Sequence, residues 1–301
     1  MSAETVNTHE PATQRLVPGL FRAIRARQWV KNVLVAAAPL AGGVLLQRGV
    51  LLHVAIAFAA FCLAASGIYL VNDVRDIESD RSHPTKRNRP IAAGVVSIPI
   101  AWSLAVLLLI TALGVCLVVN VELLLVVAVY EAVQLAYCFG LKHQPVLDLC
   151  IVASGFLLRA VAGGAAAQIP LSQWFLMCAG FGSLFMVAGK RYAEIRLSER
   201  TGVVTRRILH SYTASYLRFV WTLAASGVVT AYSLWSFEIR AQNDSPWSVV
   251  SIVPFVIAVL RYAVDVDGGD AGEPEDIALR DRVLQVLGTL WLITLALSVY
   301  A

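Results

Sequence analysis

The sequence predicts an all-α protein, a polytopic helical bundle that crosses a membrane about nine times. Hydrophobic residues make up 58% of the chain and charged residues only 15%. Soluble globular proteins have about 45–50% apolar and about 25% charged residues, so one water-soluble core cannot bury this excess. The mean hydropathy is +0.71, and apolar runs of about 20 residues, the length that crosses a bilayer, recur along the chain. Lipid is therefore the expected solvent for much of the protein.

Nine apolar segments are long enough to be candidate spans. The first contains Pro39, Gly42 and Gly43, so we expect a kink or a tilt there. The nine segments are residues 30–47, 50–72, 96–118, 121–141, 147–168, 172–190, 214–237, 247–263 and 283–300. Residues 1–20 are polar at their start and lack a signal peptide, so we expect a disordered cytoplasmic tail there. Residues 21–301 are expected to form a single transmembrane domain.

Lys and Arg residues gather on one side of the predicted bundle. Twenty of the 24 lie in the N-terminal segment or in the connections after the second, fourth, sixth and eighth spans. The opposite side has only Arg48 and Arg240, while Arg159 and Arg218 lie within or at the edge of spans. Because cytoplasmic loops are enriched in Lys and Arg, we expect a multi-pass protein of the inner membrane with a cytoplasmic N-terminus. The membrane is its expected partner, and no nucleic acid is expected.

An acidic motif follows the second span. Its members are Asn72, Asp73, Asp76 and Asp80. Spacings of three and four residues would bring Asn72, Asp76 and Asp80 to one face of a helix. Carboxylates on one stripe repel each other unless a cation lies among them, and oxygen ligands of this kind suit Mg²⁺ together with substrate phosphates. A solvated helix end balanced by Arg75 and Arg81 is the alternative, but ionisable residues continuous with a membrane helix are usually functional.

The next segment, residues 83–90, adds Lys86, Arg87 and Arg89. A metal site with nearby cations suits a diphosphate, because Mg²⁺ bridges its oxygen atoms and the cations neutralise the remaining charge. The positive-inside rule alone would also place cations in this connection. The presence of both signs of charge favours a phosphate site.

The acidic motif resembles the NDxxDxxxD signature of the UbiA superfamily of intramembrane prenyltransferases. The nine predicted spans and the polar connections after the second and sixth agree with that superfamily, and the resemblance covers roughly residues 20–300. It implies a UbiA-like helical fold that binds an isoprenyl diphosphate through Mg²⁺ and transfers the prenyl group to an acceptor.

One region departs from the pattern of the superfamily, which has a second Asp-rich motif after the sixth helix. Residues 189–199 here begin Gly189-Lys190-Arg191 and contain only two acids, Glu194 and Glu199. This change suits a substrate with additional phosphate. Segments 25–32, 134–143, 185–194 and 261–269 resemble a phosphoribosyl-transferring branch of the superfamily. The resemblance implies that 5-phosphoribose passes from phosphoribosyl diphosphate to decaprenyl phosphate, with release of diphosphate, in the synthesis of a cell-wall arabinan precursor.

The resemblance also suggests a role for each candidate residue on the cytoplasmic side. Asp73 and Asp76 are the predicted catalytic residues, and the four members of the acidic motif are predicted Mg²⁺ ligands or neighbours of ligands, with Asn72 and Asp76 the direct ones. The predicted substrate-binding residues are Lys31, Tyr69, Lys86, Tyr137, Lys142, Arg159, Lys190 and Arg191. Tyr69 and Tyr137 could equally belong to an interfacial aromatic belt. Arg159 lies inside the fifth span, where it either binds the lipid phosphate or pairs with an acid.

Two rival functions remain at this stage. A conventional UbiA-type prenyltransferase would use a prenyl diphosphate and an aromatic or other acceptor, and the Lys190-Arg191 pair argues against it. A transporter would need polar residues throughout the depth of the membrane, whereas the charges gather on one side. The sequence leaves open whether the protein forms a homo-oligomer.

Overall fold

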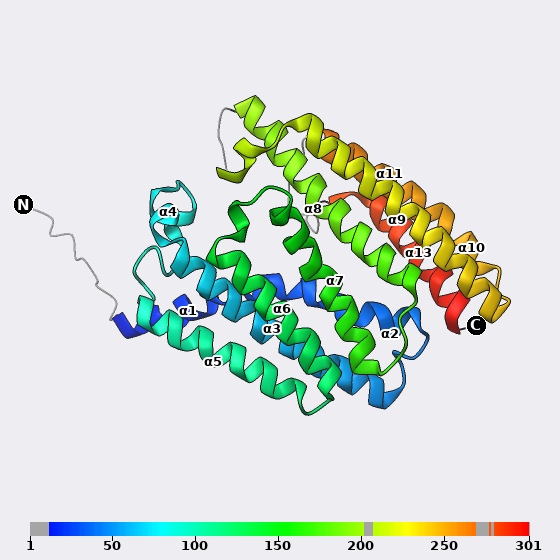
Figure 1. Ribbon diagram of the computed structural model, residues 1–301, viewed down its shortest axis with the longest axis horizontal. Helices are drawn as coiled ribbons and strands as arrows, with labels where there is room; N and C mark the ends of the chain where they lie inside the picture. The colour runs from blue at the N-terminus through cyan, green and yellow to red at the C-terminus, as the bar shows by residue number, and fades with distance from the viewer. Residues whose placement is uncertain (1–11, 202–206, 269–276, 278–279, 301) are drawn as a thin grey trace, which may run out of the picture.

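The computed structural model describes residues 12–201, 207–268, 277 and 280–300, and this part of the chain contains helices and no strands. The helices form an elongated bundle (Figure 1). In chain order, with η for a 3₁₀ helix, the elements are α1 (Ala12–Ala23), η1 (Ala26–Ala36), α2 (Ala37–Ala41), α3 (Arg48–Arg75), α4 (Ile77–Ser82), η2 (Lys86–Asn88), α5 (Ile98–Cys116), α6 (Val121–Phe139), η3 (Leu141–His143), α7 (Leu147–Ala167), α8 (Gln173–Thr201), η4 (Arg207–Ser211), α9 (Ala214–Asn243), α10 (Trp247–Val250), α11 (Ile252–Gly268) and α13 (Arg282–Tyr300).

The helical membrane fold is confirmed, but the predicted count of nine spans is not. Among the described residues, seven helical segments are long and apolar enough to cross a membrane: α3, α5, α6, α7, α9, α10 with α11, and α13. The first predicted span is divided between η1 and the short α2. Helix α8 has 29 residues, but Lys190, Arg191 and further charged residues occupy its second half, which lowers its hydropathy.

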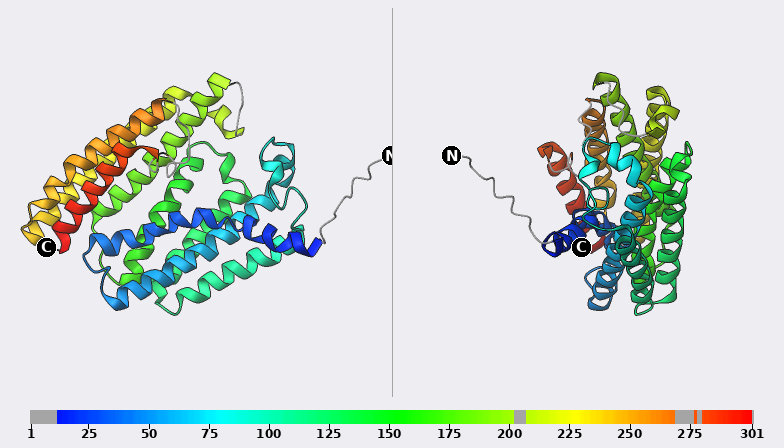
Figure 2. Two further views of the ribbon diagram at one scale, coloured as in Figure 1. Left: turned by 180° about the vertical axis from the view of Figure 1, so that it is seen from behind. Right: turned by 90° about the vertical axis from the view of Figure 1, so that its left-hand side faces the viewer.

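The helices pack in two groups. Elements η1, α2, α3, α5, α6 and α7 contact one another, as do α8, α9, α10, α11 and α13. The two groups meet where α7 packs against α8, and Figure 2 shows them side by side. The charged segments α4, η3, η4 and the C-terminal half of α8 lie toward one end of the bundle. Helix α1 also lies at that end, and the C-terminal end of α13 lies at the other (Figure 1).

Helix η1 explains why the first predicted span is not a regular α-helix. It continues as a 3₁₀ helix for 11 residues, although such helices rarely exceed three or four. With three residues per turn, Trp29, Asn32 and Val35 lie on one face. Asn32 and Val35 are fully buried, and the indole of Trp29 donates to Ser66 Oγ on α3 at 3.1 Å. Contacts with the neighbouring helices therefore hold this segment in place.

The N-terminal region differs in part from the prediction of a disordered tail over residues 1–20. Residues 1–11 lie outside the described part of the chain, whereas residues 12–20 belong to α1. Leu16 and Leu20 pack against a buried cluster that includes Ile68 and Val71 of α3. The two leucines are four residues apart and therefore lie on one face of α1, and packing of this apolar face stabilises the helix.

Candidate active site

The acidic motif lies at the end of α3, where the helix is interrupted. Asp76 ends α3 with φ −98° and ψ 9°, and α4 begins at Ile77. The N–H groups of Asp76 and Asp80 still donate to the carbonyls four residues earlier, at 2.9 and 2.8 Å, so the helical spacing of Asn72, Asp76 and Asp80 continues across this distortion. Their side chains nevertheless meet different cations. Asn72 and Asp76 meet one cation, whereas Asp73 and Asp80 meet others. The motif thus consists of two halves with different surroundings.

The buried half of the motif consists of Asp73 and Asp80, whose side chains are 3% and 4% exposed. Arg89 donates to Asp73 at 3.1 Å and to Asp80 at 2.7 Å, and Arg25 donates to Asp73 at 2.5 Å. Burial raises the pKa of Asp80 above its ordinary value, although Arg89 opposes this shift. Arg25 also lies over the ring of Tyr69, 4.8 Å from its centroid. Two guanidinium groups therefore neutralise the two carboxylates.

The open half of the motif consists of Asn72 and Asp76. Lys142 of η3 donates to Asn72 Oδ1 at 3.4 Å and forms a salt bridge with the Asp76 carboxylate. Two oxygen atoms that face one cation are a donor set that Mg²⁺ accepts when substrate phosphates supply further ligands. Asn72 and Asp76 therefore fit the ion. In the described part of the chain, no three His, Cys, Asp or Glu side chains form a group that could hold a metal.

The connection between α6 and α7 positions Lys142. It begins at Gly140, with φ 153°, and ends at Val146, with φ 69°. A β-branched residue rarely adopts a positive φ, so neighbouring contacts must stabilise this conformation. The backbone N–H of Val146 donates to the hydroxyl of Tyr212 at 2.8 Å. This hydrogen bond anchors the end of the connection, and Lys142 of η3 contacts Asn72 at the end of α3.

A second buried ion pair joins α7 to α8. Arg191 donates from Nε to Asp148 Oδ2 at 3.1 Å and from Nη2 to Asp148 Oδ1 at 3.3 Å, and both side chains are at most 4% exposed. Arg191 also contacts Glu194 at 3.3 Å, and the hydroxyl of Tyr137 donates to Asp148 at 3.0 Å. Arg191 is thus engaged with acids, while the adjacent Lys190 is half-buried on the same helix.

Arg159 lies in the interior of the bundle and is 7% exposed. It donates to Asn32 Oδ1 at 2.7 Å, to the Gly155 carbonyl at 2.6 Å and to the Tyr130 hydroxyl at 3.2 Å. Its guanidinium also lies 5.4 Å from the ring centroid of Phe61. No carboxylate of the described chain lies within ion-pair distance. Arg159 therefore joins η1, α6 and α7 through neutral partners.

The remaining predicted residues are dispersed around this end of the bundle. Lys31 on η1, Lys86 on η2 and Tyr69 on α3 are each half-buried. Arg89 was expected, with Lys86 and Arg87, to neutralise substrate phosphate, whereas in the structure it pairs with Asp73 and Asp80. No role was expected for Arg25, Asn32 or Tyr130. The two arginines lie in basic segments that the positive-inside rule already explains, so the sequence carried no separate signal for their ion pairs.

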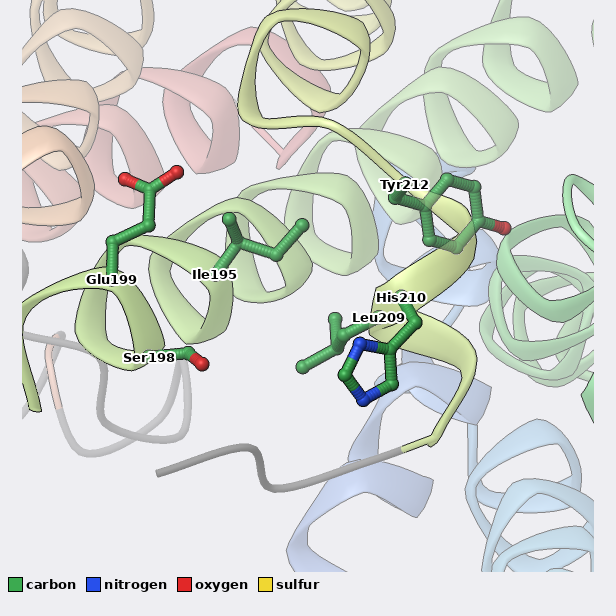
Figure 3. Close-up of a pocket in the computed structure, with 6 residues that line it drawn as sticks. All are labelled: Ile195, Ser198, Glu199, Leu209, His210 and Tyr212. Carbon is green, nitrogen blue, oxygen red and sulfur yellow. The ribbon is translucent and has the colours of Figure 1, made fainter. Parts of the chain in front are cut away.

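Figure 3 shows a cavity of about 140 Å³ between the C-terminal half of α8 and η4. Its lining consists of Ile195, Ser198, Glu199, Leu209, His210 and Tyr212. None of the predicted site residues lines this cavity. The hydroxyl of Tyr212 points away from it and bonds to Val146. The cavity is thus separate from the acidic motif.

Residues 33–298 match the UbiA prenyltransferase family, so the chain belongs to that family, as the acidic motif predicted. It is 60% identical to decaprenyl-phosphate phosphoribosyltransferase of Mycobacterium tuberculosis over 99% of each chain. It is 57% identical to the protein of the same name from Mycolicibacterium smegmatis, over 100% of this chain and 98% of the relative. The fold is similar to that of a UbiA homologue from Archaeoglobus fulgidus bound to DMAPP and Mg²⁺, with a TM-score of 0.72, 16% identity, and coverage of 93% of this chain and 97% of that one.

Proposed function

We propose that this protein transfers 5-phosphoribose from phosphoribosyl diphosphate to decaprenyl phosphate, which would supply a precursor of cell-wall arabinan. The observation that carries the proposal is the identity of 60%, over nearly the whole of both chains, with decaprenyl-phosphate phosphoribosyltransferase of Mycobacterium tuberculosis. The cations around the acidic motif support it, because both substrates are phosphate esters. A water-soluble donor reaches the charged end of the bundle directly, and a lipid acceptor extends its chain between helices.

In the proposed reaction, an oxygen atom of the acceptor phosphate attacks C1 of the ribose. The bond between C1 and the diphosphate oxygen breaks, and diphosphate departs with the bonding electron pair. The acceptor phosphate is already an anion at neutral pH, so the reaction needs no strong general base. The main requirement is to stabilise charge that develops on the departing diphosphate, which fixed cations accomplish well.

Asn72 and Asp76 are the proposed direct ligands of Mg²⁺, with Asp73 and Asp80 behind them. Mg²⁺, when bound, neutralises charge on the diphosphate oxygen atoms and orients them. Asp73 and Asp80 support the site through Arg25 and Arg89, which link the acidic motif to two other segments. In this proposal, the ion pairs of Asp73 and Asp80 hold the end of α3 in place and thereby orient the side chains of Asn72 and Asp76.

The proposed phosphate contacts are Lys31, Lys86, Lys142 and Lys190. Lys142 already lies beside Asn72 and Asp76, so its ammonium is within a side-chain rotation of a phosphate bound there. Arg191, next to Lys190, is also proposed to contact substrate phosphate, although Asp148 and Glu194 orient its guanidinium and offset its charge in the structure.

Arg159 is the proposed source of positive charge for the acceptor phosphate, because no carboxylate of the described residues pairs with it. Tyr69 and Tyr137 are proposed to lie in the wall of the substrate site. We place the active site and the N-terminus on the cytoplasmic side of the inner membrane, where phosphoribosyl diphosphate is available and where basic connections are expected.

The direct test uses purified protein in detergent with Mg²⁺, decaprenyl phosphate and phosphoribosyl diphosphate labelled in the ribose. Label should enter the lipid fraction with release of one diphosphate for each ribose transferred. Transfer of a prenyl group from a prenyl diphosphate to an aromatic acceptor, without ribose transfer, would instead favour the conventional family activity. Solute flux into proteoliposomes without any chemical turnover would favour a transporter.

Asp76→Asn should lower Mg²⁺-dependent turnover roughly 100-fold or more, because it weakens the binding of the ion that stabilises the leaving group. The measurement is the initial rate of ribose transfer as a function of Mg²⁺ concentration. Glu78→Gln is the matched control, since it removes the same charge two residues away at an exposed position. Equal rates for Asp76→Asn and Glu78→Gln would exclude Asp76 from metal binding.

A further inference from the structure

Lys142 supplies the cation that Asn72 and Asp76 share. Its ammonium lies 3.4 Å from Asn72 Oδ1 and forms a salt bridge with the Asp76 carboxylate. These two oxygen atoms are the proposed direct ligands of Mg²⁺. An ammonium group and a metal ion cannot both lie between them, so Lys142 must leave before the ion can bind both.

The charges around the acidic motif are balanced in this arrangement. Its three carboxylates pair with three cations, Arg25, Arg89 and Lys142. A divalent cation that approaches this group alone therefore experiences little net attraction, because the Coulomb terms of the two signs oppose each other. Its binding would also add two positive charges. A ligand with several negative charges removes this excess, and a phosphoribosyl diphosphate has such charges on both of its phosphate groups.

The exchange needs only a side-chain movement. Lys142 lies on the single turn η3, directly after Gly140, and the lysine stem has several rotatable bonds. The side chain of Asp76 is 29% exposed and that of Lys142 is 12% exposed, compared with 3% for Asp73. Asp76 is therefore the more accessible carboxylate of the motif, whereas Asp73 and Asp80 are enclosed beneath Arg25 and Arg89, which are themselves 25% and 27% exposed.

We infer that Lys142 competes with Mg²⁺ for Asn72 and Asp76, so that the free protein binds the ion weakly and takes it up together with a polyphosphate donor. In this exchange, the ammonium of Lys142 moves to the donor phosphates, and Asn72 Oδ1 and the Asp76 carboxylate become available to Mg²⁺. No covalent bond changes in this exchange. The identity of the donor rests on the proposed function, whereas the competition rests on the contacts of Lys142 alone.

The test measures binding of Mn²⁺, as a probe for Mg²⁺, by electron paramagnetic resonance with the full-length protein in detergent and no donor. Lys142→Met should bind Mn²⁺ roughly tenfold or more tightly than the unmodified protein, because the competing charge is gone. Arg75→Met is the matched control: Arg75 is an exposed cation at the end of α3 that lies over Phe139. Its affinity should stay within about twofold of the unmodified value, because solvent screens an exposed charge. Lys142→Arg should retain weak binding.

A second measurement uses the unmodified protein with and without donor. Phosphoribosyl diphosphate should increase its Mn²⁺ affinity roughly tenfold, and the increase should be smaller in Lys142→Met. Equal Mn²⁺ affinities of the unmodified protein and Lys142→Met would overturn the inference. If Lys142→Met does not fold, as judged by its helical circular dichroism, the unmodified protein alone provides the test. A Mn²⁺ affinity that is the same with and without a polyphosphate would then overturn the inference. An increase in Mn²⁺ affinity with a prenyl diphosphate but not with phosphoribosyl diphosphate would support competition by Lys142 but reject phosphoribosyl diphosphate as the donor.

Discussion

Arg89 contacts two buried carboxylates at once, at 3.1 Å from Asp73 and 2.7 Å from Asp80. Its own side chain is 27% exposed, whereas the two carboxylates are nearly inaccessible. A buried charge that loses its partner is much more costly than the net contribution of the pair, because the remaining ion has neither water nor a counter-ion. Asp73 keeps Arg25, but Asp80 has Arg89 as its ion-pair partner among the described residues.

Arg89→Met should lower the free energy of unfolding by about 2–4 kcal/mol at neutral pH, because it leaves the Asp80 carboxylate buried and unpaired. Burial raises the pKa of Asp80, and removal of Arg89 should raise that pKa further. A raised carboxyl pKa favours the protonated folded state, so the stability lost at neutral pH should return as pH falls through that pKa. Melting temperatures in detergent between pH 8 and pH 5 provide the measurement.

Two controls separate this effect from a general loss of positive charge. Arg87→Met removes an exposed cation two residues earlier and should change the melting temperature little. Combining Arg89→Met with Asp80→Asn should recover part of the stability, because the uncompensated carboxylate is gone. A melting temperature of Arg89→Met that equals that of Arg87→Met at every pH would contradict the assignment.

At the scale of elements, η1 and α7 approach each other closely at Gly163. A Cβ atom added to Gly163 would lie 1.9 Å from the carbonyl oxygen of Val35. Only a glycine permits this approach. The same crossing brings Asn32 to Arg159 at 2.7 Å, so the position of η1 and the contacts of Arg159 depend on each other.

Gly163→Ala should destabilise the protein by about 1–3 kcal/mol, because backbone atoms of η1 must move to accept the new methyl group. Gly114→Ala in α5 is the matched control, since nothing lies within 4 Å of its added Cβ. That substitution should be neutral or stabilise by up to about 1 kcal/mol, as expected for alanine in a helix interior. Thermal unfolding of the two variants in one detergent compares them, and equal melting temperatures would show that η1 adapts freely.

At the scale of the whole molecule, the two ends of the bundle differ in charge and in chemistry. The end that includes α4 and η3 contains the paired acids and bases of the site. The two groups of helices join between α7 and α8, and the buried pair of Asp148 and Arg191 lies at that junction. The proposed site residues thus come from both groups of helices.

The predicted orientation has a direct test by cysteine labelling. In a background without the five native cysteines, Ser79→Cys on α4 should react with a membrane-impermeant maleimide only in inside-out vesicles. Asp244→Cys, in the turn after α9, should react only in intact cells whose outer surface is accessible. Both positions are exposed. The reverse pattern of labelling would invert the orientation and place the site on the outer side.

Features with a local signal could be predicted from the sequence. The helical membrane fold was confirmed, and the acidic motif and Lys142 could be singled out as candidates, because their residue types and spacings occur within single segments. The partners of these residues were not recognisable. Arg25 meets Asp73 across 48 positions, Lys142 meets Asn72 across 70, and Arg159 meets Asn32 across 127. Such pairings depend on how helices pack, and no periodicity within a segment encodes them.

By itself, the sequence determined that the chain resides in lipid and that its Lys and Arg residues gather in alternate connections, and it predicted that an acidic motif with nearby cations forms the active site. These properties follow from composition and short-range spacing, which do not depend on contacts between helices. Only the tertiary structure decided that the acidic motif divides at Asp76, that arginines neutralise Asp73 and Asp80, and that Lys142 meets Asn72 and Asp76. The physical reason is that a buried carboxylate needs a cation beside it, and the packing of the whole bundle decides which cation lies within reach.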